Sequence, residues 1–455
     1  MTNEVLVDFH GQGAGVGELT WGQRTVWRTV VKTGHSETMG GVTPVPPGTT
    51  VQQSAGVLRY VMGRHQSLRT RLVFDGQDGG PRQRVYDSGR IGMAVVEAGA
   101  DDPGEVAERV RRDYEDADFD YEHEWPVRMA VITKDGTPTH SVAVYNHLAI
   151  DAHGLDALIA DLSTMDRTNF GPTVPLDATQ PLALAEQQRK PNVLRNSEAA
   201  LRYWERVLRT VSPKRVEGES DDHRSPRFGD VALTSPAAAL ATRAIAVRLG
   251  IDTSPVLLAA YACALARTVG NNPVAVQIAV NNRFRQSLLG SVCTMAQTCP
   301  LMVDVADIGF AEAVHRARQA TMVTYKYAYY DPEKRAAMVA AVAEDLGGPV
   351  EMDTYFNDRR PPGRAEQSLT APDPAEITAA RGRTGHEWVR WTDVDQPLLY
   401  MDIDEAMDGT EALVFTLTGD THRVAPAALL GLLQEVETVL VDAALDPGAG
   451  TGVKS

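Results

Sequence analysis

An antiparallel hairpin that leads directly into a helix is the feature that most constrains the fold of this chain. Residues 127–133 and 139–145 are rich in β-branched and apolar side chains, and Lys134-Asp135-Gly136 provides a turn between them. Residues 155–162 then carry apolar side chains at helical spacing. Strands joined by a short turn run antiparallel, so the pattern disfavours a regular repeat of parallel strands and helices. It predicts the α+β class.

Further strands and helices follow in irregular order along the chain. Their limits are set by runs of β-branched residues, by helical spacing of apolar residues, and by Gly, Pro, Asn and Asp at turns. Ser254 is expected to cap the helix that follows it. The predicted strands are 5–9, 82–86, 92–97, 274–280, 353–357, 386–393, 397–404 and 412–418, and the predicted helices are 51–64, 105–116, 197–211, 255–269, 311–322, 332–346 and 426–444.

Two segments bear on domain organisation and cofactor binding. The glycine run 11–17 lacks the G-x-G-x-x-G spacing of a dinucleotide site, and we expect a flexible loop there. Residues 171–192 are rich in Pro, Thr and Gln and are expected to connect two halves. Since 455 residues suffice for two cores, we predict an N-terminal domain over 1–180 and a C-terminal domain over 181–455.

Charge and cysteine usage exclude several classes of function. A formal net charge of -16 disfavours nucleic acid and anionic membrane surfaces as partners.

We find no secretory signal and no apolar run long enough to span a bilayer, so a cytoplasmic location is expected. The three cysteines, Cys263, Cys293 and Cys299, are too sparse for a disulfide framework, and no ligand pattern accompanies them. We therefore expect no metal site.

His147 stands where the predicted strand 139–145 gives way to a helix, four residues before Asp151. An imidazole is the side chain best suited to moving a proton near neutral pH. Side chains at such a junction can reach a cleft while rigid elements hold them. The His-x-x-x-Asp pattern alone is also compatible with an ordinary histidine at a strand end.

Several motifs, in the same order along the chain, resemble those of condensation domains from nonribosomal peptide synthetases. The family's His-His-x-x-x-Asp-Gly motif is similar to Asn146-His147-x-x-x-Asp151-Ala152. The other matching segments are Leu19-Thr20-x-x-Gln23-x-x-x-Trp27, Arg64-His65-x-x-Leu68-Arg69-Thr70-Arg71, Tyr203-Trp204-x-x-x-Leu208, Val280-Asn281-Asn282-Arg283, Gln297-Thr298-Cys299-Pro300-Leu301 and Tyr355-Phe356-Asn357.

The resemblance implies a fold and an assembly state. Condensation domains consist of two chloramphenicol-acetyltransferase-like lobes, arranged as a V-shaped pseudo-dimer with a tunnel between them. The predicted connection at 171–192 agrees with two such lobes. The sequence shows no adenylation or carrier segment, so we expect a free-standing member that acts as a monomer.

The resemblance also assigns roles to residues. His147 would be the catalytic residue, acting as general base on a nucleophile or positioning it. Asp151 would pair with Arg283 from the other lobe and fix the loop that aims His147. Asn146 replaces the first histidine of the motif, and its amide can still support the loop. Ala152 replaces the glycine and restricts the backbone there.

Three more residues are candidate substrate contacts. His153 lies at the start of the predicted helix, where an ordinary solvated residue is the alternative. Gly154 could restore room that Ala152 removes. Asn357 is placed on the C-terminal lobe by its Tyr-Phe-Asn segment. Arg64 and Arg69 are expected to have structural roles, and the alternative is that they contact substrate near the tunnel mouth.

The resemblance implies a condensation-type acyltransferase of natural-product biosynthesis, which joins an acyl or aminoacyl thioester to a small amine or alcohol. The donor would be held on the phosphopantetheine arm of an acyl or peptidyl carrier protein, and no bound cofactor is expected. One alternative is a coenzyme A thioester as donor. The other is a catalytically silent module that recruits a biosynthetic partner. Amide and ester products both remain open.

Overall fold

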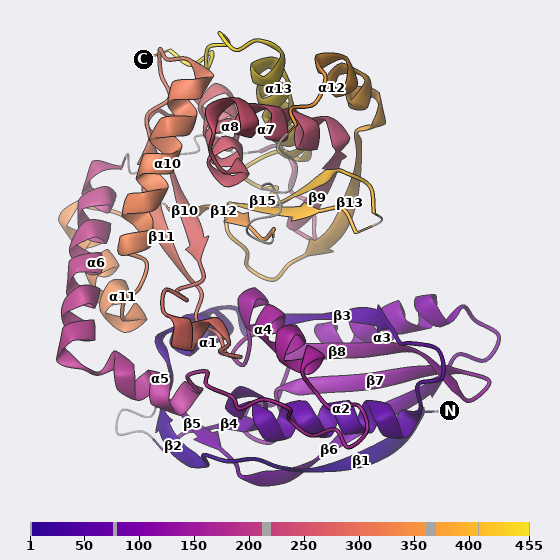
Figure 1. Ribbon diagram of the computed structural model, residues 1–455. Helices are drawn as coiled ribbons and strands as arrows, with labels where there is room; N and C mark the ends of the chain where they lie inside the picture. Colours follow the sequence, from indigo (N-terminus) through magenta and orange to yellow (C-terminus); the bar gives the residue numbers. More distant parts are fainter. Residues whose placement is uncertain are drawn as a thin grey trace. The chain divides into compact units, whose positions relative to one another are not determined.

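The computed structural model describes residues 2–75, 80–211, 220–350, 352–360, 370–407 and 409–454. The chain forms two compact units, each with its own sheet and helices (Figure 1). Unit 1 comprises Met1–Arg195 and Asn281–Gln297, and unit 2 comprises Asn196–Val280 and Thr298–Ser455. The predicted α+β class is confirmed, since both units mix helices with largely antiparallel sheets.

The boundary between the units differs from the prediction. Unit 1 ends at Arg195 instead of residue 180, and it takes in Asn281–Gln297 from the second half of the sequence. The second half of the expected connection 171–192 is helical, because it contains α5 (Pro181–Gln188) and the start of α6 (Pro191–Thr210). A proline suits the first helical position, where no backbone donor is needed, so a residue taken as a loop signal begins α5.

The main sheet of unit 1 has the strand order β1-β6-β7-β8-β3. β6 and β7 run parallel, and the other neighbours run antiparallel. The predicted hairpin is confirmed: Asp135 and Gly136 form its two-residue turn with φ values of 51° and 73°, the left-handed backbone that a type I′ turn requires. The strands are β1 (Thr2–His10), β3 (Thr38–Pro44), β6 (Ser88–Glu97), β7 (Val127–Lys134) and β8 (Thr137–Asn146).

Helices cover both faces of this sheet (Figure 1). Leu58 and Leu158 bring α2 and α4 into one apolar cluster with strand residues such as Val131. Val106 brings α3 into a second cluster with Ile132, which points to the opposite face because strand side chains alternate. The helices are α2 (Val51–Arg64), α3 (Pro103–Asp116) and α4 (Ala152–Ser163).

A small sheet of order β2-β5-β4 completes unit 1, together with α1 (Trp21–Thr33). Its strands are β2 (Gly15–Glu18), β4 (Thr70–Val73) and β5 (Arg82–Val85). The glycine run was expected to be a loop, and this is wrong for residues 15–17, which belong to β2. Gly17 lies so close to helix α5 that an added Cβ would be 2.9 Å from Leu182, so the glycine permits strand and helix to meet.

Unit 2 is built on a sheet of order β11-β10-β12-β14-β15-β9-β13. The strands are β9 (Phe228–Ser235), β10 (Val274–Val280), β11 (Gln297–Val303), β12 (Thr354–Asp358), β13 (Gly385–Thr392), β14 (Leu399–Glu405) and β15 (Leu413–Asp420). The helices are α7 (Pro236–Leu249), α8 (Thr253–Val269), α10 (Phe310–Lys326), α11 (Pro332–Asp345), α12 (Pro374–Ala380) and α13 (Pro426–Leu445). Helix α8 lies at the centre of the core, and its residues from Val256 to Ala266 are all buried.

Helices α7 and α8 show where local patterns mislead. Helix α7 was not predicted, because its alanine-rich sequence has few polar positions to mark an exposed face. Helix α8 was predicted, but its cap was not: Asp252 occupies the N-cap position, and Ser254 already lies within the first turn. The polar residues 213–227 between α6 and β9 are expected from the sequence to form a loop, and part of this segment, residues 213–219, lies outside the described part of the chain.

Among the described residues, no single helix is long and apolar enough to cross a membrane. Helices α7 and α8 reach that length and apolarity only when taken together, and the chain bends by 115° between them.

A close approach of α1 to the 281–297 segment yields a test of the fold of unit 1. An added Cβ at Gly22 would lie 2.2 Å from the carbonyl oxygen of Thr294. We expect Gly22→Ala to lower the free energy of unfolding by about 1–3 kcal/mol, as overpacking does, measured by urea denaturation of the whole chain. Gly431→Ala is the matched control, since its Cβ would meet nothing within 4 Å on α13. It should leave stability unchanged or raise it, and equal losses in both variants would contradict the packing described.

Candidate active site

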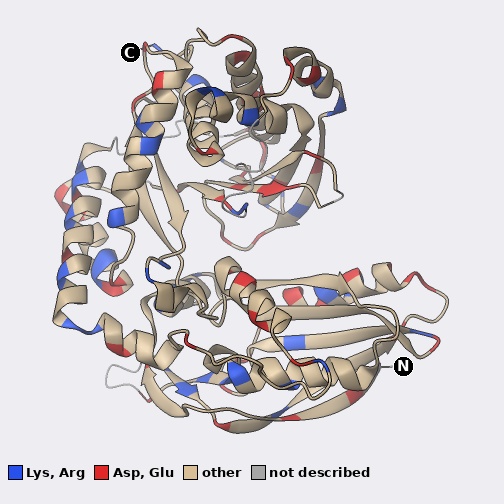
Figure 2. Ribbon diagram, viewed as in Figure 1, with Lys and Arg blue, Asp and Glu red and all other residues tan. Residues whose placement is uncertain are grey.

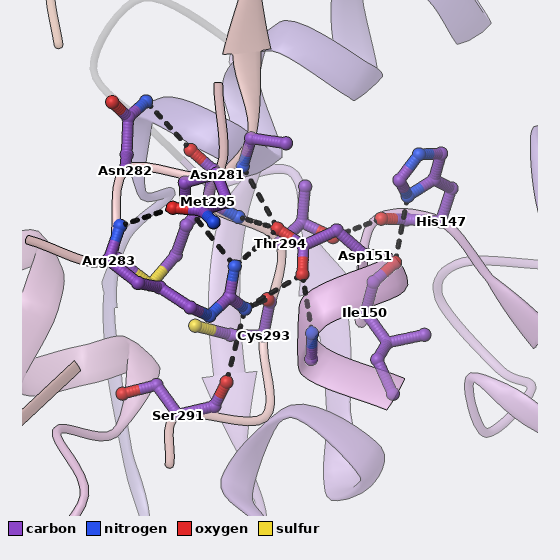
Figure 3. A network of polar contacts seen from close by, with 12 residues as sticks. His147, Ile150, Asp151, Asn281, Asn282, Arg283, Ser291, Cys293, Thr294 and Met295 are labelled. Carbon is purple, nitrogen blue, oxygen red and sulfur yellow. Dashed lines mark hydrogen bonds and ion pairs between the residues drawn. The ribbon is translucent and has the colours of Figure 1, made fainter. Parts of the chain in front are cut away.

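His147 lies in the turn between β8, which ends at Asn146, and α4, which begins at Ala152. Its backbone N–H donates to the carbonyl oxygen of Glu37 over 2.8 Å. Its ring Nδ1 lies 2.8 Å from the carbonyl oxygen of Ile150 (Figure 3). A carbonyl only accepts, so Nδ1 carries a hydrogen, and Nε2 of the neutral ring keeps its lone pair.

Asn146 supports the turn from inside. The residue is buried, and its side-chain oxygen accepts the backbone N–H of Ala149 over 3.1 Å. Its backbone carbonyl accepts the same N–H, also over 3.1 Å. The amide thus provides the loop support that was expected of it, although the family's histidine is missing.

Asp151 lies at the centre of a network of hydrogen bonds. It is buried, and its carboxylate accepts five hydrogen bonds, from the two terminal nitrogens of Arg283 and from the backbone N–H groups of Gly154, Met295 and Ala296. The bond to Gly154 makes Asp151 the N-cap of α4. Burial raises the pKa of this carboxyl, but the Arg283 guanidinium and the hydrogen bonds outweigh it and hold the pKa below its usual value.

Arg283 forms the predicted pair with Asp151, with Nη1 2.9 Å from Oδ2 and Nη2 2.7 Å from Oδ1 (Figure 3). The same guanidinium donates to the carbonyl oxygens of Asn281, Ser291 and Cys293. The expectation that the arginine belongs to the other lobe is corrected, because Asn281–Gln297 clusters with unit 1. The reason is that this segment leaves β10 and folds around the arginine, which binds the segment's own carbonyls as well as Asp151.

Asn282 and Thr294 strengthen the same segment. Asn282 has a φ of 57°, a left-handed conformation that asparagine tolerates, and its side chain donates to the carbonyl oxygen of Met295 over 3.1 Å. The hydroxyl of Thr294 donates to the carbonyl oxygen of His147 (Figure 3). Thr294 was missed in the sequence, where a single threonine carries no signal of such a contact.

The first turn of α4 contains two of the candidate substrate contacts. Gly154 is buried, and an added Cβ would lie 3.0 Å from the carbonyl oxygen of Cys293, so packing alone accounts for this glycine. His153 is partly exposed. A contact of either residue with substrate stays a prediction.

Asn357 belongs to unit 2 and is not part of the network around His147. It lies on β12, where its side chain donates to Asp402 over 2.8 Å. Burial raises the pKa of Asp402 to about 6, while the nearby Arg359 and the bond from Asn357 act in the opposite direction. Its expected role as a substrate contact also stays a prediction.

The arginines of the Arg-His segment have structural roles, as expected. Arg64 donates to Asp161 over 2.8 Å, and the fully buried His65 lies 3.1 Å from the same carboxylate. These partners lower the pKa of Asp161 to about 2, against the opposing effect of burial. Arg69 is buried and donates to the carbonyl oxygens of Gln12 and Tyr86.

Glu37 is a second residue near His147 that the sequence did not reveal. Burial raises the pKa of its carboxyl, and the charge of His147 acts to lower it. Its position depends on β3, which was not predicted because two consecutive glycines interrupt the strand pattern.

Carboxylates, histidines and cysteines are possible metal ligands. Within the described ranges, no three His, Cys, Asp or Glu side chains lie together as metal ligands would. The three cysteines are buried thiols, and burial raises the pKa of Cys263 and Cys293 to about 12.

Comparison with known proteins identifies the family of the chain. The sequence matches the condensation domain family over residues 39–336, and the chain belongs to this family. An isonitrile lipopeptide synthase of Mycobacterium tuberculosis is 30% identical over 285 residues. That alignment covers 58% of this chain but only 11% of the synthase, so the chain corresponds to a small part of its relative.

Solved structures confirm the fold. The first condensation domain of the calcium-dependent antibiotic synthetase superposes with a TM-score of 0.70 at 17% identity, covering 96% of this chain and 98% of that one. The X-domain from teicoplanin biosynthesis, solved in complex with OxyB, superposes with a TM-score of 0.71 at 19% identity, covering 97% and 96%. The chain has the chloramphenicol-acetyltransferase-like fold of condensation domains, as predicted.

The buried pair predicts a pH-dependent loss of stability in Asp151→Asn. This change leaves the Arg283 charge buried without its counter-ion, and we expect the free energy of unfolding to fall by about 3–5 kcal/mol at neutral pH. Because folding lowers the pKa of Asp151 from 3.8, its contribution is present above about pH 4 and is lost as the pH falls through the lower folded value. The difference between wild type and variant should therefore shrink below about pH 4 in urea denaturation curves.

Asp8→Asn is the matched control for this experiment. Asp8 also pairs with an arginine, Arg90, over 2.7 Å, but both side chains are exposed. Solvent screening should make the loss small in this variant. A loss as large as that of Asp151→Asn would contradict the account of a buried pair.

Proposed function

We propose that the chain is a condensation-type acyltransferase in which His147 acts as general base on the attacking nucleophile. The observation that carries the proposal is the bond from Nδ1–H to the Ile150 carbonyl, which leaves Nε2 free to accept a proton. The donor is an acyl or aminoacyl thioester on the phosphopantetheine arm of an acyl or peptidyl carrier protein. Membership of the condensation domain family supports this donor class.

The reaction balances with His147 as the only proton carrier when the nucleophile is a neutral amine or alcohol. Nε2 accepts the N–H or O–H proton while the nitrogen or oxygen attacks the thioester carbonyl carbon. The tetrahedral intermediate collapses, the carbon–sulfur bond breaks, and the imidazolium returns the proton to the leaving thiolate. The products are an amide or ester and a free thiol. A positioned imidazole contributes about 10²- to 10⁴-fold to such a step.

Asp151 and Arg283 act on this chemistry through position. Their ion pair fixes the start of α4 against the 281–297 segment, and Thr294 of that segment holds the carbonyl of His147. These contacts hold the backbone of His147 and keep its ring in one orientation. Orientation matters because a small displacement of a catalytic group lowers the reaction rate strongly. Asn146 contributes from the other side of the turn.

A catalytically silent module that recruits a partner enzyme is the second candidate. Two departures from the family motif favour it, Asn146 for the first histidine and Ala152 for the glycine. The X-domain from teicoplanin biosynthesis, whose fold this chain shares, was solved in complex with OxyB. The intact hydrogen bonds around His147 favour the enzyme over this module.

An intact-mass assay of His147→Ala tests the proposal. Wild type and variant are mixed with panels of acyl-carrier and acyl-coenzyme A thioesters and with pooled small amines and alcohols. We expect the wild type to form product and the variant to be slower by about 10²- to 10⁴-fold, because the base is missing. The donor panel also separates carrier-bound thioesters from coenzyme A thioesters.

His123→Ala serves as the control, since His123 is an exposed histidine of the same unit. It should retain the wild-type rate. Product formation at the wild-type rate by His147→Ala would exclude His147 as the base. If neither the wild type nor His147→Ala forms product, and both proteins bind a biosynthetic enzyme tightly, the chain is better described as a recruiting module.

A further inference from the structure

Two nitrogen donors of unit 2 lie without an acceptor where α11 meets α6. Trp204 of α6 is fully buried, and no described residue accepts a hydrogen bond from its indole Nε1–H. Arg335 lies in the first turn of α11, and its Nε is also buried without a partner in the described part of the chain. The guanidinium carbon of Arg335 is 4.1 Å from the centroid of the Trp204 ring, so the two donors are neighbours.

The elements around this pair of donors are held by specific contacts. Tyr330 packs edge-on against Trp204 with 5.7 Å between the ring centroids, and its hydroxyl donates to the carbonyl oxygen of Thr298 over 2.7 Å. The backbone N–H of Asp331, directly before α11, donates to the hydroxyl of Ser197 on α6 over 2.9 Å. These contacts fix α11 against α6, and therefore Trp204 and Arg335 face each other in a built site.

The chemistry of the two side chains defines what they lack. An indole N–H and a guanidinium only donate hydrogen bonds, so a group that satisfies both must be an acceptor. The contact with the Trp204 ring stabilises the positive charge but supplies no acceptor for the N–H groups. Within the described ranges, the Arg335 guanidinium forms no ion pair. A charge partly withdrawn from water is unfavourable without a counter-ion, so the missing partner is an anion.

The surface beside this place also favours an anion. Figure 2 shows Lys and Arg on α6, α10 and α11. Arg206 follows Trp204 by two residues and Lys334 directly precedes Arg335, and both of these cations are exposed. Exposed cations raise the local concentration of anions, even on a chain whose formal net charge is -16.

We propose that Trp204 and Arg335 bind an oxyanion, the carboxylate or phosphate group of a small molecule. The edge of a guanidinium matches two oxygens of such a group, and the indole N–H donates to one of them. Arg335 is partly exposed, which gives the ligand access from solvent. Both residues belong to unit 2, whereas the network around His147 belongs to unit 1, so this inference goes beyond the proposed acyl transfer.

The test follows the indole N–H signal of Trp204 in the whole chain, labelled with ¹⁵N-tryptophan. Trp204→Phe identifies this signal among those of the six tryptophans by its absence, and its change in Arg335→Met provides a second identification. Sodium acetate, sodium phosphate and sodium chloride are titrated separately, at one pH and over the same range of ionic strength. We expect a saturable downfield shift with acetate or phosphate, because a hydrogen bond to the oxyanion forms. The salt that saturates at the lower concentration identifies the ligand as a carboxylate or a phosphate.

Variants of Arg335 test whether the guanidinium binds the anion. Arg335→Met keeps an unbranched side chain over the Trp204 ring but removes the charge and the donors. It should raise the half-saturating concentration by about 10- to 100-fold, the effect of losing a hydrogen bond to a charged group. Arg335→Lys should lose less, because it keeps the charge but not the two-pronged edge. Arg206→Met is the matched control, since Arg206 is an exposed arginine over the ring of Tyr203, and it should bind like the wild type.

Three results would overturn the inference. The first is the absence of a saturable shift with both acetate and phosphate. The second is an equal response to chloride, which would indicate a general effect of salt. The third is an unchanged half-saturating concentration in Arg335→Met. None of these measurements requires acyl transfer, so the oxyanion site stands or fails independently of the role of His147.

Discussion

The buried ion pair between Asp151 and Arg283 is the interaction on which the rest of the site depends. Two charges with side chains only 3% exposed would be unfavourable unless every oxygen and most donors were satisfied. Five hydrogen bonds to the carboxylate and three carbonyls around the guanidinium meet this requirement. The pair therefore joins a strand-to-helix turn to a segment more than a hundred residues later, and neither can shift without breaking it.

Fixing the turn determines what His147 can do. The turn presents the Ile150 carbonyl to one ring nitrogen, and Thr294 and Asn146 hold the backbone on either side. The hydrogen on Nδ1 then leaves a proton acceptor at Nε2. Glu37, directly before the edge strand β3, accepts the backbone N–H of His147 with its carbonyl oxygen and so holds the turn against the sheet.

Features with a strong local cause could be predicted from the sequence. The Asp135-Gly136 turn and helix α2 appear where expected, because the Asp-Gly turn and the helical spacing of apolar residues are local signals. The pairing of Asp151 with Arg283 was implied by family resemblance, and the structure confirms the pair but places both residues in unit 1. Thr294 was not predicted, because a hydrogen bond from its hydroxyl to a carbonyl far away in the sequence leaves no pattern. Glu37 was not predicted, because the glycines of the neighbouring edge strand β3 interrupt the alternation that marks a strand.

The proposed chemistry requires that the hydrogen of the neutral His147 ring is on Nδ1. Nitrogen NMR shows directly which ring nitrogen carries it. The protein would carry ¹⁵N-labelled histidine rings, and His147→Ala would identify the His147 signals by their absence. In the neutral ring, we predict a protonated Nδ1 and an unprotonated Nε2. A neutral His147 with its hydrogen on Nε2 would contradict the proposal, because the nitrogen that should accept the proton would already carry one.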